Sequence, residues 1–186
     1  MKRIFFGLVV AMIGTGAFTI GVAASDGCSK RSSPDVAIEA CTRQLAGQPD
    51  SAAAIKAHLV RGAAYARKGM NEAAAGDFTS VLKVAPANQD ALLGRGEVYL
   101  AQRSFKLAAD DFTALIALKP AHVTALIGLG YSYLARDQAE DAVATFSKAL
   151  EHDPRNGVAL NNRGLAYKKL GNIDAAISDF TTAVQF

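Results

Sequence analysis

Apolar residues recur at helical spacing through most of the chain. Within residues 123–154, Leu126, Leu129, Gly130 and Tyr133 fall at positions i, i+3, i+4 and i+7, which form one face of a helix. The pattern therefore predicts a first helix with one apolar face. After a short polar turn, a second predicted helix carries the same spacing at Ala142, Phe146, Ala149 and Leu150.

This two-helix unit occurs four times, with a period of 34 residues. A Gly-x-x-Tyr motif marks the first helix of every copy, and alanine, phenylalanine and proline follow in the same register. Periods between about 20 and 50 residues are typical of solenoids, in which each unit packs on the next. The repeated positions are Gly62/Tyr65, Gly96/Tyr99, Gly130/Tyr133 and Gly164/Tyr167, then Ala74, Ala108, Ala142 and Ala176, then Phe78, Phe112, Phe146 and Phe180, and finally Pro86, Pro120 and Pro154.

These motifs resemble the signature of the tetratricopeptide repeat family over residues 55–186. The resemblance implies an all-α fold, a right-handed superhelical solenoid of antiparallel helix pairs. It implies about four repeats plus an N-terminal half repeat. The four repeats are expected at residues 55–88, 89–122, 123–156 and 157–186, the last without a capping helix.

The sequence departs from the family pattern at two positions of the first helix. His58 occupies a core position that is leucine in the other copies. A normally aliphatic position holds Arg61, Arg95 and Arg163, and remains aliphatic only at Leu129.

Residues 25–54 are predicted to form an N-terminal arm and a capping half repeat. A single helix is expected over residues 35–47, with Cys41 in the position of the repeated phenylalanine. The alignment that supports this half repeat pairs Ala37, Cys41, Leu45 and Pro49 with Ala74, Phe78, Leu82 and Pro86 at a constant offset of 37.

The first residues have the layout of a secretory signal peptide. Lys2 and Arg3 precede an uncharged stretch from Ile4 to Ala24, which ends in small residues. We expect residues 1–24 to be removed, which would place the protein in the periplasm or outside the cell. The alternative is an uncleaved membrane anchor, because about 20 apolar residues can span a bilayer. The protein would then be held at the inner membrane and face the periplasm.

Export favours a disulfide between Cys28 and Cys41, the two cysteines of the chain. Closing a loop of that size is worth about 3 kcal/mol in the chain-entropy model. The alternative is a buried Cys41 and a free thiol at Cys28. Two cysteines with no histidine nearby do not make a metal site.

No arrangement of residues in the sequence indicates catalysis. The formal charge is +3 and the basic residues are scattered, so a nucleic-acid partner is not expected. Gly94 and Gly96 imitate a dinucleotide motif but lie within a predicted helix. The carboxylate pairs Asp110-Asp111 and Glu140-Asp141 are assigned to a solvated helix face. We therefore expect no enzyme activity, no cofactor and no metal.

Protein binding is the function that the resemblance implies, in a concave groove lined by the first helices. The family's clamp for a peptide carboxylate is not expected, because its positions hold Leu59 and Ala63 here. We expect a scaffold or chaperone-like adaptor that binds a peptide or helix, unless residues 25–34 cover the groove. The alternative is a membrane-tethered assembly factor. The predicted groove residues are Leu59, Ala63, Arg67, Leu93, Glu97, Leu100, Ile127, Tyr131, Leu134, Asn161 and Lys168.

The fourth copy is predicted to have an apolar end surface. Phe186 is assigned to its second helix, and Ala176, Phe180 and Ala183 are expected to be exposed. Ends of solenoids normally carry a polar outer face. We therefore expect either a homodimer through this repeat or a docked partner.

Overall fold

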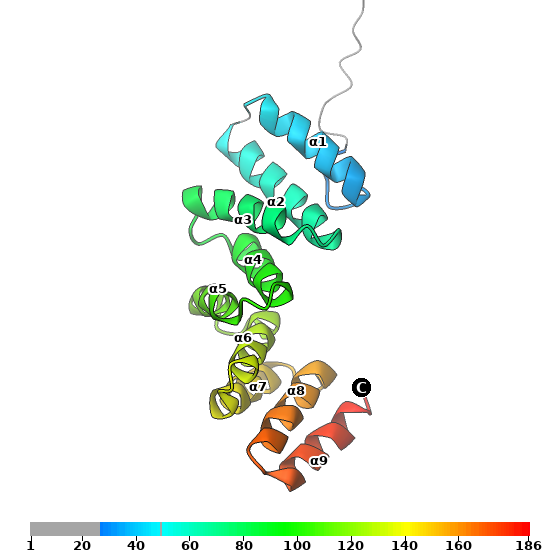
Figure 1. The fold of residues 1–186 in the computed structure, drawn as a ribbon, viewed down its shortest axis with the longest axis vertical. Helices are drawn as coiled ribbons and strands as arrows, with labels where there is room; N and C mark the ends of the chain where they lie inside the picture. The colour runs from blue at the N-terminus through cyan, green and yellow to red at the C-terminus, as the bar shows by residue number, and fades with distance from the viewer. Residues whose placement is uncertain (1–26, 49) are drawn as a thin grey trace, which may run out of the picture.

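In the computed structural model, which describes residues 27–48 and 50–186, the chain is an elongated stack of helices (Figure 1). The described residues contain helices and no strands, which confirms the all-α prediction. The predicted signal segment, residues 1–24, lies outside the described residues. The helices are α1 (Pro34–Ala46), α2 (Ser51–Arg67), α3 (Asn71–Val84), α4 (Gln89–Ala101), α5 (Phe105–Leu118), α6 (Val123–Ala135), α7 (Ala139–His152), α8 (Gly157–Lys169) and α9 (Ile173–Ala183).

Each helix packs against the helix before it and the helix after it, as expected for a solenoid. In addition, α2 contacts α4, α4 contacts α6 and α6 contacts α8. The first helices of successive pairs therefore lie side by side along one side of the stack. Helix α1 packs on α2 and covers the N-terminal end, where the sequence predicts a capping half repeat.

Polar side chains fix where the first helices begin. Asp50, Asn88, His122 and Asn156 each accept a hydrogen bond from the backbone N–H three residues later. Such caps satisfy one of the free N–H groups of the first turn. Because Asp50 provides this cap, α2 begins at Ser51, earlier than the expected repeat boundary at residue 55.

The turn inside each pair contains one residue with positive φ. These residues are Gly69, Arg103, Asp137 and Gly171, at φ values of 71°, 58°, 69° and 77°. Glycine reaches this conformation without a steric penalty, whereas arginine does so at some cost. The turn geometry is therefore the same in all four pairs, although only two of them have the residue best suited to it.

Glycines of the first helices make room for the repeated phenylalanines. A Cβ atom added at Gly94 or Gly128 would lie 2.5 Å from the ring of Phe78 or Phe112, respectively. Each of these rings also lies against a glycine of its own repeat. This glycine is Gly62 for Phe78 and Gly96 for Phe112. Gly94 and Gly96 therefore serve helix packing, in agreement with the rejection of a dinucleotide site.

The end of the fourth repeat differs from the prediction in two respects. Helix α9 ends at Ala183, so Phe186 lies beyond it, under the guanidinium of Arg155 at 4.5 Å from the ring centroid. The expected exposure of three residues is wrong: Ala176 is buried, and Phe180 and Ala183 are half-buried, because all three pack toward α8. The large exposed apolar residues of α9 and the residues after it are Ile173, Ile177, Val184 and Phe186.

Across the described part of the chain, no helix combines the length and the apolar character that a bilayer crossing needs.

Candidate protein-binding groove

A hollow of about 510 Å³ lies between α2 and α4 on the side formed by the first helices. Its walls are mainly apolar and include Leu59 and Ala63 of α2, Leu93 of α4, and part of the Phe78 ring. Leu59, Ala63 and Leu93 are half-buried, so each still presents carbon atoms to solvent. The hollow is therefore a preformed apolar site with charged residues around it.

The structure brings five of the predicted groove residues together in this hollow. They are Leu59, Ala63 and Arg67 from α2, with Leu93 and Glu97 from α4. They meet because α2 and α4 are in direct contact and present equivalent faces.

The other predicted groove residues lie farther along the stack. Leu100, Ile127 and Leu134 pack partly into the core between repeats. Tyr131 is 43% exposed and meets the ring of Phe105 edge-on, with centroids 6.1 Å apart. The apolar surface is therefore less continuous than the sequence suggests. Asn161 and Lys168 are exposed on α8.

Glu97 is a carboxylate in a mainly apolar setting. Its outer atoms reach solvent, but the apolar side chains of the hollow remove part of its hydration. This desolvation raises the pKa of Glu97, because burial disfavours the charged form.

The N-terminal arm reaches the edge of the hollow. Lys30 lines it and donates a hydrogen bond from Nζ to Asp90 Oδ2 on α4, at 3.0 Å. Arg67 Nη2 approaches the carbonyl oxygen of Ser32 at 3.4 Å, and Lys68 forms an ion pair with Asp35 at the start of α1. The alternative in which the arm covers the groove is thus seen in part, since described residues of the arm lie at one end of the groove.

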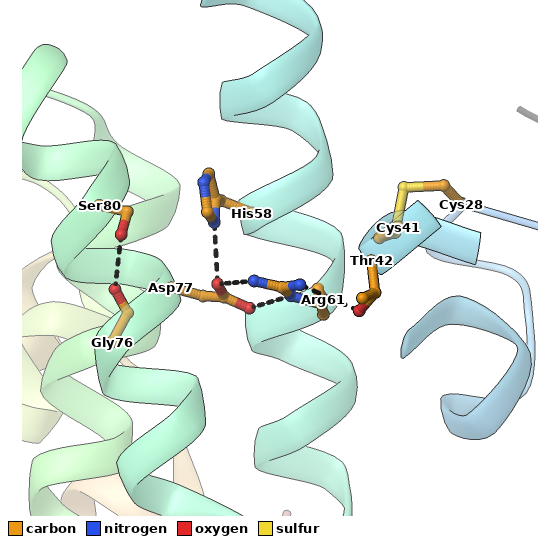
Figure 2. Close-up of polar contacts among 8 residues, drawn as sticks. All are labelled: Cys28, Cys41, Thr42, His58, Arg61, Gly76, Asp77 and Ser80. Atoms are coloured by element: carbon orange, nitrogen blue, oxygen red, sulfur yellow. Dashed lines mark hydrogen bonds and ion pairs between the residues drawn. A yellow bond between two sulfur atoms is a disulfide. The ribbon is translucent and has the colours of Figure 1, made fainter. Parts of the chain in front are cut away.

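The two cysteines hold this arm against α1. The sulfur atoms of Cys28 and Cys41 are at disulfide distance, and their Cα atoms are 4.8 Å apart (Figure 2). Both residues are buried with α1 and α2. Cys28 therefore anchors the arm to α1.

A buried ion pair connects the helices of the first repeat. Arg61 donates from Nε and Nη2 to both carboxylate oxygens of Asp77, at 2.8 Å each, and from Nη1 to the hydroxyl of Thr42 on α1 (Figure 2). His58 Nδ1 lies 2.8 Å from the same carboxylate. His58 is therefore half-buried and polar in its contacts, rather than a simple replacement for a core leucine. One arginine links three helices.

The same arrangement recurs in the second and fourth repeats. Arg95 binds Asp111 and the Thr79 hydroxyl, while Arg163 binds Asp179 and the Ser147 hydroxyl. Each carboxylate is nearly inaccessible to solvent. The hydrogen bonds to these carboxylates raise the pKa of each arginine above its usual value, so the charge is permanent.

The assignment of Asp111 to a solvated helix face is therefore wrong. Asp110 is exposed, but Asp111 is buried against α4. The sequence does contain the relevant signal: an aspartate follows the arginine by 16 residues in three copies. The third copy has lost both partners, with Leu129 and Thr145 in their places.

The other two histidines of the chain lie at helix ends. His122 caps α6 and His152 lies in the last turn of α7. Within residues 27–48 and 50–186, no group of three or more metal-binding side chains is found.

The fold and the hollow define a helical-repeat solenoid with an open concave face. Three models of the repeat match the sequence, described as "Tetratricopeptide repeat" at residues 59–123 and 157–186 and as "TPR repeat" at residues 130–171. Together they cover more than half of the chain. The chain belongs to the tetratricopeptide repeat family, which confirms the resemblance seen in the motifs.

Solved structures of MamA share this fold. One is 23% identical over 82% of this chain and 87% of its own, with a TM-score of 0.76. Another, from Desulfovibrio magneticus RS-1, is 25% identical over 85% of this chain and 88% of its own, with a TM-score of 0.78. A comparison with curated proteins finds no match. The family and the fold support a protein–protein interaction scaffold of a non-catalytic type.

Proposed function

We propose that this protein is an exported, non-enzymatic scaffold or chaperone-like adaptor that binds a peptide or a helix in its concave groove. The observation that carries this proposal is the apolar hollow of about 510 Å³ between α2 and α4. A preformed concave site with a few charged groups is the usual form of a binding site. Apolar carbon on Leu59 and Leu93 provides the surface that a partner would remove from water.

Site-specific photo-cross-linking tests the position of the site. A photoreactive residue at Leu93 is expected to capture partner protein in the native host. The matched control places the same residue at Leu107, which is 47% exposed on α5 and does not line the hollow. Equal capture from both positions would contradict the groove assignment.

Charge introduced into the hollow provides a second test. Leu59→Glu and Leu93→Glu should abolish capture and leave the helical circular dichroism unchanged, because both side chains already reach solvent. Retained capture by the folded double variant would show that the partner binds elsewhere.

Export is proposed from the layout of residues 1–24 and fits the paired cysteines, because disulfides persist in oxidising compartments. N-terminal sequencing of the protein from its host discriminates between the two forms. Ser25 as the first residue supports an exported protein, and Met1 supports the membrane-tethered assembly factor.

A homodimer through the fourth repeat is a further proposal, favoured by the exposed Ile173 and Ile177 on α9. Light scattering at micromolar concentration should give a dimer mass, and Ile177→Lys should convert it to a monomer. A monomer mass for the unchanged protein would exclude this contact.

A further inference from the structure

The hollow between α2 and α4 contains a cationic side chain that comes from a distant part of the chain. Lys30 of the arm and Asp90 of α4 are 60 residues apart in sequence, yet their charged atoms lie 3.0 Å apart. Lys30 and Asp90 both line the hollow. The arm thus shows that this site accepts an ammonium group beside its apolar walls.

The contact made by Lys30 is easily replaced. Its side chain is 71% exposed and that of Asp90 is 61% exposed, so water competes for both charges. Exposed ion pairs of this kind contribute little to stability. The nearby contact from Arg67 to the carbonyl of Ser32 is long for a hydrogen bond, at 3.4 Å. A stronger ligand can therefore displace this part of the arm while the Cys28–Cys41 link holds its other end.

The hollow also offers a second carboxylate. Glu97 lies two helical turns after Asp90 on α4, about 10 Å along the helix axis. Residues seven apart share one helix face, and Glu97 lines the same hollow. Without the arm, the charged groups facing the hollow are Arg67, Asp90 and Glu97. The site then has an excess of negative charge on an apolar surface.

We propose that the hollow binds a partner segment in which lysine or arginine residues stand among apolar residues, and that Lys30 occupies the position of one of these cations in the free protein. This inference rests on the proposed function and specifies the partner that the groove selects. A basic residue of the partner replaces Lys30 at Asp90, and a second donor reaches Glu97. The apolar residues between them cover Leu59 and Leu93. Lys30 of the arm therefore competes with the basic residue of the partner for Asp90.

Peptide display tests this proposal without a known partner. Random twelve-residue peptides on phage are selected against the whole exported protein, and affinities of the selected peptides are measured by fluorescence anisotropy. We expect enrichment of lysine or arginine together with leucine, isoleucine or valine. Replacing the enriched basic residues of a peptide by glutamine should weaken its binding at least tenfold.

Substitutions in the protein test which of its charged side chains affect the affinity for the peptides. Asp90→Asn with Glu97→Gln should lose about tenfold in affinity for the basic peptides, and Lys30→Gln should gain severalfold because the competitor is gone. The matched control is Lys106→Gln with Asp110→Asn on α5, an exposed ion pair at 3.2 Å with side-chain exposures of 76% and 61%. This control pair does not line the hollow and should leave the affinity unchanged.

The outcomes separate this inference from the proposed function. Apolar or acidic peptides that bind in a Leu93-dependent way, with equal affinity for the Asp90 and Glu97 variants, would overturn the inference and leave the groove intact. Unchanged affinity in Lys30→Gln would overturn the competition by the arm. If peptides bind the Leu93→Glu variant with unchanged affinity, or if no peptide is selected at all, both the proposed binding groove and this inference are wrong.

Discussion

The second and third repeats are both pairs of helices joined by a turn, and three of the positions at which they differ change the contacts described above. Where the α4–α5 pair has Arg95, Asp111 and Glu97, the α6–α7 pair has Leu129, Thr145 and Tyr131. The second repeat thus places a buried ion pair between its helices and a carboxylate in the groove. The third repeat has an apolar contact and an aromatic ring at these places.

The difference shows that the ion pair is not required for the fold. Leu129 is buried, and the Thr145 hydroxyl donates to the backbone carbonyl of Asp141 at 2.7 Å. The residues that replace the ion pair in the third repeat are therefore an apolar side chain in the core and a hydroxyl with a hydrogen-bond partner in its own helix. A buried ion pair can be replaced by well-packed residues without loss, whereas removal of one partner is costly. Arginine and aspartate therefore have to change together.

The largest expected effect is the loss of one partner in the second repeat. Asp111→Ala leaves the guanidinium of Arg95 without its carboxylate in a site where its side chain is 21% exposed. We expect a loss of about 3 kcal/mol in the free energy of unfolding, measured by urea titration followed by circular dichroism. Thr145→Ala at the equivalent position should cost about 1 kcal/mol, because only a neutral hydrogen bond is lost. Equal losses would refute the contrast between the repeats.

A somewhat smaller effect is expected when the ion pair is built into the third repeat. Leu129→Arg alone should lower stability by about 2 kcal/mol, because the charge is buried without a partner. Adding Thr145→Asp should recover most of that loss, with a coupling energy of about 1–3 kcal/mol in a double-mutant cycle. Thr113 already occupies the hydroxyl position that Thr79 holds for Arg95. Absence of coupling would show that the third repeat has a different register.

The reverse exchange in the second repeat should be nearly neutral. Arg95→Leu with Asp111→Thr copies the third repeat, and we expect stability within about 1 kcal/mol of the unchanged protein. The thermal midpoint of unfolding, followed by circular dichroism, measures this. A loss as large as that of Asp111→Ala would mean that the ion pair itself stabilises the second repeat.

The smallest expected effect concerns the groove position. The raised pKa of Glu97 means that the folded protein binds this proton more tightly than the unfolded chain, so stability falls as the pH rises from the unfolded to the folded pKa. Glu97→Gln removes this penalty and should stabilise the protein at pH 7. The advantage should disappear below about pH 4, where the glutamate is protonated in both states.

The control for that measurement is Glu140→Gln, at an exposed glutamate of α7. Glu140 lies in the first turn of α7, where a negative charge is favourable, so this substitution should not stabilise the protein at pH 7. A Glu97→Gln advantage that persists at low pH would point to packing rather than to charge.

The fold could be predicted because its determinants are local and periodic. The glycine and phenylalanine positions recur with one spacing, so each turn and each helix contact is specified four times. Asp110 and Asp111 are neighbours on one helix and point about 100° apart. The 16-residue spacing from arginine to aspartate, repeated in three copies, marks Asp111 as the partner of Arg95. The packing of α4 against α5 shows that Asp111 is the buried one.

The groove was predictable in part for the same reason. Family positions place Leu59, Leu93 and Glu97 on the first helices, and the contact between α2 and α4 brings them to one hollow. The burial of Leu100, Ile127 and Leu134 was missed, because helical spacing gives the face of a helix but not how closely its neighbour covers it.

The sequence by itself determined the repeat, the all-α class and the family, since a fixed period needs no knowledge of distant contacts. Tertiary structure decided which carboxylates are buried and where the arm lies. Asp77 receives His58 and Arg61 from another helix, and Asp90 receives Lys30 from 60 residues away. Arg61 and Asp77 follow the repeated 16-residue spacing, whereas the contacts of His58 and Lys30 follow no repeat, and only the folded stack brings those groups within hydrogen-bonding distance.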